Sequence, residues 1–170
     1  MPLPSSSRRL VLLIALGAVL AHVVVVYLAT LVIWNDTPSV PRGLYLRHQM
    51  APVEPGRTVI LPVPVGVQGL VAERGYLPPT STLMKVVAAM PGDRVCLDGR
   101  DYQVNGRIIA RVRSQDTHGR PLPVYRFCDT VGPGQAFVAT SAPLSFDSRY
   151  FGPVAISTLT VVTPLWMSSP

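Results

Sequence analysis

The sequence predicts a mainly β domain carried by one N-terminal transmembrane helix. Only 14% of the 170 residues are charged, against about 25% in an ordinary globular domain, which excludes a disordered or highly solvated chain. All 18 prolines and 12 of the 13 glycines lie outside the most apolar stretch, and they favour short strands joined by turns over a helical bundle. The length allows one domain of ordinary size.

The predicted transmembrane helix covers residues 10–34, which contain no Asp, Glu, Lys or Arg. At about 1.5 Å per residue this run reaches about 37 Å as a helix, enough to cross a hydrocarbon core of about 30 Å. A cleaved signal peptide is the alternative, because Val19, Leu20 and Ala21 loosely satisfy a cleavage rule. The apolar run continues well beyond Ala21, which favours a retained anchor.

The charges beside this run predict its orientation. Arg8 and Arg9 precede it, and by the positive-inside rule they place residues 1–9 in the cytoplasm. Residues 35–170 are then expected outside the inner leaflet, in a periplasm or its equivalent.

Seven β-prone runs follow the predicted anchor, separated by turn formers. Asp98 to Asp101 and Asn105-Gly106 are tight-turn sequences at hairpin spacing, which predicts a β-meander over residues 94–112. Residues 114–123 are polar and proline-containing, which predicts a surface loop. The runs are residues 59–61, 84–89, 94–97, 102–104, 108–112, 136–139 and 160–162.

Cys96 and Cys128 are the two cysteines of the chain, and the predicted compartment permits a disulfide between them. Two small buried thiols are the alternative. Without a CxxC or a nearby His pattern the pair makes a poor zinc site, so a metal is not expected. No cofactor is expected for the chain either.

The net charge of +6 does not indicate a nucleic-acid partner, because the basic residues are scattered as singles and pairs.

Of the 15 basic residues, Lys85 is the sole lysine. Unlike Arg, a buried Lys can lose its charge near neutral pH, so a chain that otherwise uses Arg could retain one Lys as a base. Lys85 lies in an apolar, strand-like run, where desolvation would lower its pKa; chance is the alternative.

Ser39 is the candidate nucleophile. Pro38 and Pro41 flank it and predict a sharply shaped, extended segment that presents the hydroxyl on a rigid backbone. Ser39 lies five positions after Trp34, so the hydroxyl lies within about 18 Å of the end of the apolar run. A substrate must therefore also be at the membrane surface. A proline-rich linker is the alternative interpretation.

A third group of candidate residues, after those around Lys85 and Ser39, lies nearer the C-terminus. Ser145 and Asp147 alternate around Phe146, so in an extended segment both side chains share one face, and Arg149 follows on the same face. An Asp147–Arg149 pair could order the segment while Ser145 forms a hydrogen bond with a neighbouring amine. A loop of turn formers is the alternative.

Histidine does not complete a Ser/His/Asp arrangement convincingly. His22 lies in the predicted membrane span, His48 near the anchor, and His118 in the polar loop. A serine with a lysine base is therefore the favoured chemistry.

Three segments in this order after one anchor resemble the bacterial type I signal peptidases, and more closely their conjugative-transfer branch, the TraF-type pilin-maturation peptidases. The segments are residues 39–45, 84–93 and 145–153. The resemblance implies a serine endopeptidase with a Ser/Lys dyad in a mostly antiparallel β fold. By position, Ser39 resembles the nucleophile, Lys85 the general base, and Asp147 the third residue on which activity depends.

The resemblance also implies supporting roles. Thr37 stands where a hydroxyl helps the backbone N–H of the nucleophile to form the oxyanion hole, Ser145 where a serine orients the lysine, and Arg149 where an arginine pairs with the acid. Val40 and Pro41 follow the nucleophile directly, as in the conjugative branch, whereas general leader peptidases have Met after it.

The predicted function is removal of a leader or tail from a membrane-inserted, exported precursor, most simply the pilin subunit of a conjugation apparatus. The resemblance implies that aminolysis could yield a cyclic pilin in place of hydrolysis. The alternatives are a general type I signal peptidase and a non-catalytic, anchored β-domain of a secretion or conjugation apparatus. The expected partners are the precursor and the lipid bilayer, with no nucleic acid.

Overall fold

The structure is a computed structural model that describes residues 5–78 and 81–168. It divides the chain into two compact units, Met1–Ile33 and Trp34–Pro170. The first is mainly one helix, and the second is a β domain that contains every candidate catalytic residue.

Helix α1 spans Ser5–Leu31, and its segment Arg9–Leu31 is long and apolar enough to cross a membrane. The helix was predicted to continue to residue 34, but it ends at Leu31, and Val32–Asn35 form strand β1. Val32, Ile33 and Trp34 are β-branched or aromatic, and such residues favour a strand where a neighbouring strand is available for pairing. Apolar composition alone could not locate this boundary.

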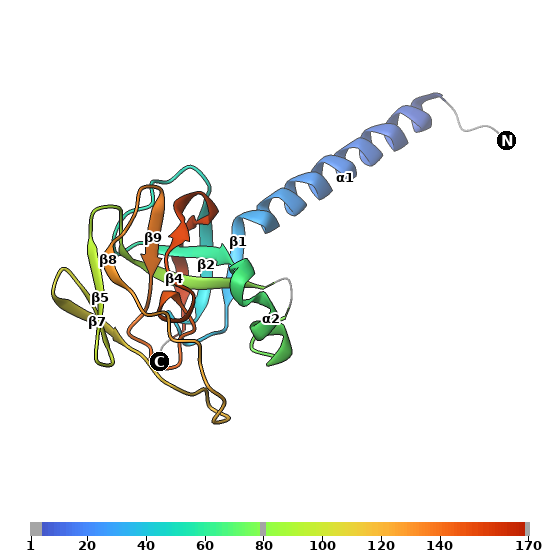
Figure 1. Cartoon of the computed structure of the whole chain (residues 1–170). Coiled ribbons are helices and arrows are strands. Elements are labelled where there is room, and N and C mark those ends of the chain that lie inside the picture. The colour runs from blue at the N-terminus through green and yellow to red at the C-terminus, as the bar shows by residue number, and fades with distance from the viewer. Residues whose placement is uncertain (1–4, 79–80, 169–170) are drawn as a thin grey trace. The chain divides into compact units, whose positions relative to one another are not determined.

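Two antiparallel sheets form the β domain (Figure 1). The larger has the order β1-β2-β11-β3-β4-β9-β10, and the smaller has the order β7-β6-β5-β8. The remaining strands are β2 (Gly43–His48), β3 (Thr58–Pro62), β4 (Thr82–Ala89), β5 (Arg94–Asp98), β6 (Asp101–Val104), β7 (Arg107–Arg111), β8 (Cys128–Thr130), β9 (Gln135–Val138), β10 (Val154–Ala155) and β11 (Thr160–Met167).

The mainly β fold is confirmed, and each of the seven predicted runs lies on a strand: β3, β4, β5, β6, β7, β9 and β11. The predicted meander corresponds to β5, β6 and β7. Its Asn105-Gly106 turn has positive φ at both residues, 50° and 80°, as a type I′ hairpin turn requires. Residues 114–123 are irregular apart from one bridge between Gln115 and Pro121.

Several elements were not predicted: β2, β8, β10, helix α2 (Val65–Glu73), the short helix α3 (Ser148–Phe151) and a 3-10 turn at Ile156–Thr158. Helix α2 follows Pro64 and buries Val67 and Val71, which lie one helical turn apart. That spacing is a helix signal in the sequence. In contrast, β8 has three residues, all exposed, and β10 has two, so neither carries a readable pattern.

The core under α2 explains where Lys85 lies. Leu83 and Val87 of β4 belong to this core together with Val67 and Val71 of α2. Because side chains alternate along a strand, Lys85 emerges on the same face as Leu83 and Val87. The register of β4 therefore directs the lysine inward, with Val59 of β3 as its cross-strand neighbour.

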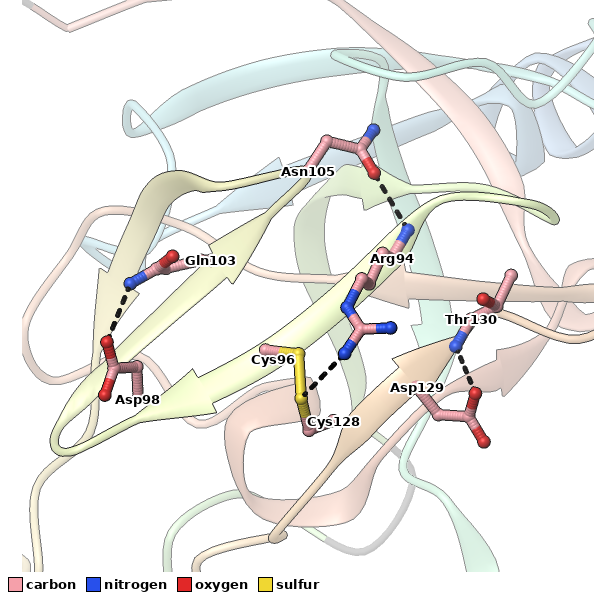
Figure 2. Close-up of a disulfide and its surroundings, with 8 residues drawn as sticks. All are labelled: Arg94, Cys96, Asp98, Gln103, Asn105, Cys128, Asp129 and Thr130. Carbon is pink, nitrogen blue, oxygen red and sulfur yellow. Dashed lines mark hydrogen bonds between the residues drawn. A yellow bond between two sulfur atoms is a disulfide. The ribbon is translucent and has the colours of Figure 1, made fainter.

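Cys96 and Cys128 form a disulfide that joins β5 to β8 (Figure 2). They are directly paired residues of the two strands. Cys128 is exposed and Cys96 half-buried, so they are not two buried thiols. In Figure 1, β5, β7 and β8 lie together on one side of the β domain and α2 on the other, so the disulfide lies away from the region that α2 covers.

Candidate active site

Ser39 lies in the connection between β1 and β2, half-buried. The chain bends there, with Pro38 and Ser39 at the centre of a turn, where an extended segment was predicted. The fixed φ of proline suits the first central position of such a turn, so Pro38 favours the bend that brings Ser39 into the domain.

Lys85 contacts Ser39, although the two residues lie 46 positions apart in the sequence. Its Nζ donates a hydrogen bond of 2.9 Å to Ser39 Oγ. The lysine is 3% exposed, and burial, the main cause, lowers its pKa from 10.5 to about 8. The structure thus brings together the two residues that the sequence singled out as nucleophile and base.

The environment of Lys85 contains a buried ion pair. Arg149 holds Asp147 through two bonds of 2.7 Å, Nε to Oδ1 and Nη2 to Oδ2, and both side chains are fully buried. Asp147 raises the pKa of Lys85 and Arg149 lowers it. The pair therefore places two opposite charges near the lysine, and burial remains the largest effect on its pKa.

The pair forms by a different route from the one predicted. Residues 148–151 are helical, so Arg149 does not reach Asp147 by strand alternation. Asp147 caps α3 by accepting a hydrogen bond from the Arg149 backbone N–H, and the Arg149 side chain folds back onto the carboxylate. Arg149 also donates to three backbone carbonyls, those of Arg111, Ala142 and Ser145. It therefore ties together segments that lie far apart in the sequence.

Ser145 and Thr37 both line the same cleft as Ser39 and Lys85. Ser145 is buried, but in the described part of the chain its Oγ has no hydrogen-bond partner, and no bond to Lys85 is present. The Thr37 hydroxyl donates a hydrogen bond of 2.7 Å to Asn35 Oδ1. Both residues therefore line the cleft, and in the described part of the chain neither side chain is bonded to Ser39 or Lys85.

The cleft has a volume of about 290 Å³ and a largely apolar lining. Ser39 and Lys85 are polar residues in this largely apolar lining. Such a cleft, with a few convergent polar groups and a residue of perturbed pKa, has the character of a binding site. Its apolar side chains include Val71, Leu77, Leu83, Leu122, Leu144 and Phe146.

One wall of the cleft comes from the loop that the sequence predicted only as surface. Asp116 of this loop accepts hydrogen bonds from the Tyr76 hydroxyl, at 2.6 Å, and from Arg120 Nε, at 2.7 Å. Arg74 donates to the Pro121 carbonyl at 2.7 Å. These bonds fasten residues 114–123 to the segment that follows α2, and sequence spacing gave no signal for them.

The described residues that line the cleft include no histidine. His48 bonds Thr163, with 2.7 Å between Nε2 and Oγ1, and neither His48 nor His118 lines the cleft. Within residues 5–78 and 81–168, no group of three or more His, Cys, Asp or Glu side chains could hold a metal ion.

Comparison with known proteins assigns the family. The profile of the signal peptidase family, peptidase S26, matches residues 6–166. The chain therefore belongs to the signal peptidase S26 family, and the resemblance inferred from its motifs is confirmed.

Among its relatives are transfer proteins. A plasmid transfer protein TraF of Escherichia coli is 37% identical over 143 residues, covering 77% of this chain and 80% of that protein. A conjugal transfer protein TraF of Agrobacterium tumefaciens is 35% identical over 147 residues, covering 80% of this chain and 82% of that protein. A solved signal peptidase I of Enterococcus faecalis has 18% identity and a TM-score of 0.38, covering 66% of this chain and 96% of that one.

Proposed function

We propose that this chain is a membrane-anchored serine endopeptidase that uses Ser39 and Lys85 to process an exported precursor, the pilin of a conjugation apparatus. The observation that carries the proposal is the 2.9 Å hydrogen bond between Lys85 Nζ and Ser39 Oγ in an apolar cleft. A buried lysine with a pKa of about 8 is partly neutral at physiological pH, which a general base requires.

In the proposed mechanism, neutral Lys85 takes the proton of Ser39 as Oγ attacks the carbonyl carbon of the scissile peptide bond. The C–N bond then breaks, and the Lys85 ammonium returns the proton to the departing amine. This leaves an ester on Ser39, which either water or an amine can attack. We assign the developing oxyanion to the backbone N–H of Ser39, with Thr37 holding the turn that presents it.

Asp147 and Arg149 have a supporting role in this mechanism. Their ion pair orders residues 142–149 beside the lysine, and its two charges act on the pKa of Lys85 in opposite directions. Ser145 lies close by in the cleft lining and is proposed to orient the lysine during turnover.

The substrate assignment is supported by the TraF relatives, whose names place them in plasmid and conjugal transfer. A pilin-like precursor held in the membrane fits an enzyme whose Arg9–Leu31 segment could span a bilayer. We therefore propose that residues 35–170 form the periplasmic part of a protein of the bacterial inner membrane, with residues 1–9 in the cytoplasm. The product would be cyclic if the pilin's own amino terminus is the amine that attacks the Ser39 ester.

The test is mass spectrometry of a candidate pilin precursor co-expressed with the wild type, with Ser39→Ala and with Ser157→Ala. Ser157 is exposed and outside the cleft lining, so it controls for loss of a serine hydroxyl. We expect a shortened pilin with the wild type and Ser157→Ala and an intact precursor with Ser39→Ala. A cyclic product would be lighter than the linear one by one water. Processing by Ser39→Ala would contradict the proposal, and equal cleavage of an ordinary secretory leader would favour a general signal peptidase.

A further inference from the structure

Asn35 ends strand β1 four residues before Ser39, and its side chain is almost fully buried at 5% exposure. Its Nδ2 donates to three backbone carbonyls, those of Thr37 at 3.0 Å, Val40 at 3.1 Å and Pro41 at 3.1 Å. Its Oδ1 accepts from the Thr37 backbone N–H at 3.2 Å and from Thr37 Oγ1 at 2.7 Å. One amide therefore contacts the turn on both sides of Ser39 without touching Ser39 itself.

The turn needs this support because of its own sequence. Pro38 and Pro41 have no N–H, so the turn loses two of the donors that would otherwise hold it. The Asn35 amide supplies two N–H donors and one acceptor from a single short side chain. Asp has the same shape but donates nothing, and Gln is longer by one methylene, so neither reproduces this set of bonds.

We propose that Asn35 is the positioning residue of the Ser39–Lys85 site: its amide fixes the turn that presents the Ser39 hydroxyl to Lys85. This inference rests on the proposed function. The inference also gives the Thr37 hydroxyl a role: its single proton is donated to Asn35 Oδ1, and this bond stabilises the turn. A displacement of about 1 Å in a reacting group can cost about 100-fold in rate, so a loosened turn should act on kcat.

The test is steady-state kinetics of the full-length, detergent-solubilised protein carrying Asn35→Asp, with a pilin precursor peptide as substrate. The substituted side chain would keep the acceptor but face three carbonyl oxygens with a carboxylate. We expect kcat to fall about 10- to 100-fold with KM within about twofold of the wild type. The labelling of Ser39 by a fluorophosphonate probe should slow in parallel, since it needs the same hydroxyl but no peptide substrate.

The matched control is Asn105→Asp. Asn105 also uses its amide to hold a turn, through Arg94 N at 2.9 Å and Asp93 Oδ1 at 2.8 Å, but it lies in the meander (Figure 2) and does not line the cleft. We expect this variant to lose thermal stability and keep its kcat. A general structural role for Asn35 would instead make the two variants behave alike.

The outcomes separate this inference from the proposed function. If the wild type cleaves and is labelled while a folded Asn35→Asp protein keeps full kcat, the positioning role is wrong and the peptidase assignment stands. If Ser39→Ala cleaves as well as the wild type, the proposed function fails first. Should Asn35→Asp not fold, Asn35→Ala removes the same five bonds without adding a charge. If both unfold where Asn105→Asp is folded, Asn35 is a structural residue and the inference is overturned.

Discussion

Lys85 is a base candidate because of where β4 places it. A lysine on the outer face of the same strand would keep a pKa near 10.4 and remain charged at neutral pH. Its register between Leu83 and Val87 directs it into the core, and burial lowers its pKa to about 8. The nearby Asp147 and Arg149 act on that pKa in opposite directions, so burial decides the outcome.

The pH dependence of cleavage follows from this pKa. Lys85 must be neutral to accept the Ser39 proton, so kcat/KM should rise with pH through a midpoint near 8. The measurement is kcat/KM for a precursor peptide from about pH 6 to about pH 10, a range that brackets this ionisation. A profile that is flat across the midpoint would argue against a lysine base.

The substitution Lys85→Met tests the effect of this burial on the stability of the folded protein. The folded-state pKa of Lys85 lies below its ordinary value of 10.5, so burial of the charged form penalises folding below pH 8, and the penalty fades between pH 8 and 10.5. Methionine has similar size and no charge. At about pH 6 the variant should therefore unfold at higher denaturant, with a gain of about 1–3 kcal/mol after loss of the bond to Ser39, while being inactive. The gain should vanish above pH 10.5, and a variant less stable than the wild type in mild acid would contradict the account.

At the scale of elements, the wall of the cleft depends on Asp116. Burial raises the pKa of this carboxyl, but the bonds from Tyr76 and Arg120 outweigh burial, so the pKa lies well below its usual value. The ionised Asp116 carboxylate therefore stabilises residues 114–123 at pH values above the ordinary Asp pKa of about 3.9. This stabilisation is lost as the pH falls further, toward the lowered pKa of the folded state.

Asp116→Asn should loosen this wall and leave the Ser39–Lys85 pair in place. We expect KM to rise by about threefold to tenfold with a smaller change in kcat, and proteolysis within residues 114–123 to become faster. Asp101→Asn is the matched control, because Asp101 also pairs with an arginine, Arg111, but lies outside the cleft lining. Equal KM values for the two variants would show that Asp116 does not shape the substrate site.

Sequence patterns predicted the elements with regular alternation and tight turns, and missed those whose conformation depends on partners. The Asn105-Gly106 turn carries its own φ preference, so the meander was predictable. The α2 helix could have been found from Val67 and Val71, which follow Pro64 at helical spacing. Strand β8 could not, because its three exposed residues are held by pairing and a disulfide to β5.

The residues of the candidate site also fall into those with a local sequence signal and those whose role depends on partners in the folded chain. Residue type and local sequence singled out Ser39 and Lys85, since a lone lysine in an apolar run and a serine between prolines are unusual in themselves. The Asp147–Arg149 pair was predicted, but by strand alternation instead of a capped helix. Asn35 and Asp116 act through bonds to turns and loops that exist only in the folded chain, and their sequence neighbours give no hint of those bonds.

At the scale of the whole molecule, the proposed topology places the β domain outside the cytoplasm. Protease added to spheroplasts should digest residues 35–170 and spare the N-terminal segment, because the two arginines before the apolar run retain that end inside. Western blots against tags at the two ends provide the measurement. Protection of the domain until the membrane is opened would reverse the orientation.

The central claim is that Ser39 and Lys85 act as one catalytic unit, and Lys85→Arg tests it most directly. Arginine keeps the positive charge and much of the stem but cannot supply an unprotonated nitrogen. The measurement is cleavage of a detergent-solubilised pilin precursor by the wild type, Ser39→Ala, Lys85→Arg and the double variant, with circular dichroism to verify each fold. We expect both single variants to be inactive, and the double variant to lose little more, because the residues act together. A folded Lys85→Arg protein that retains most of the wild-type activity would refute the Ser/Lys mechanism for this chain.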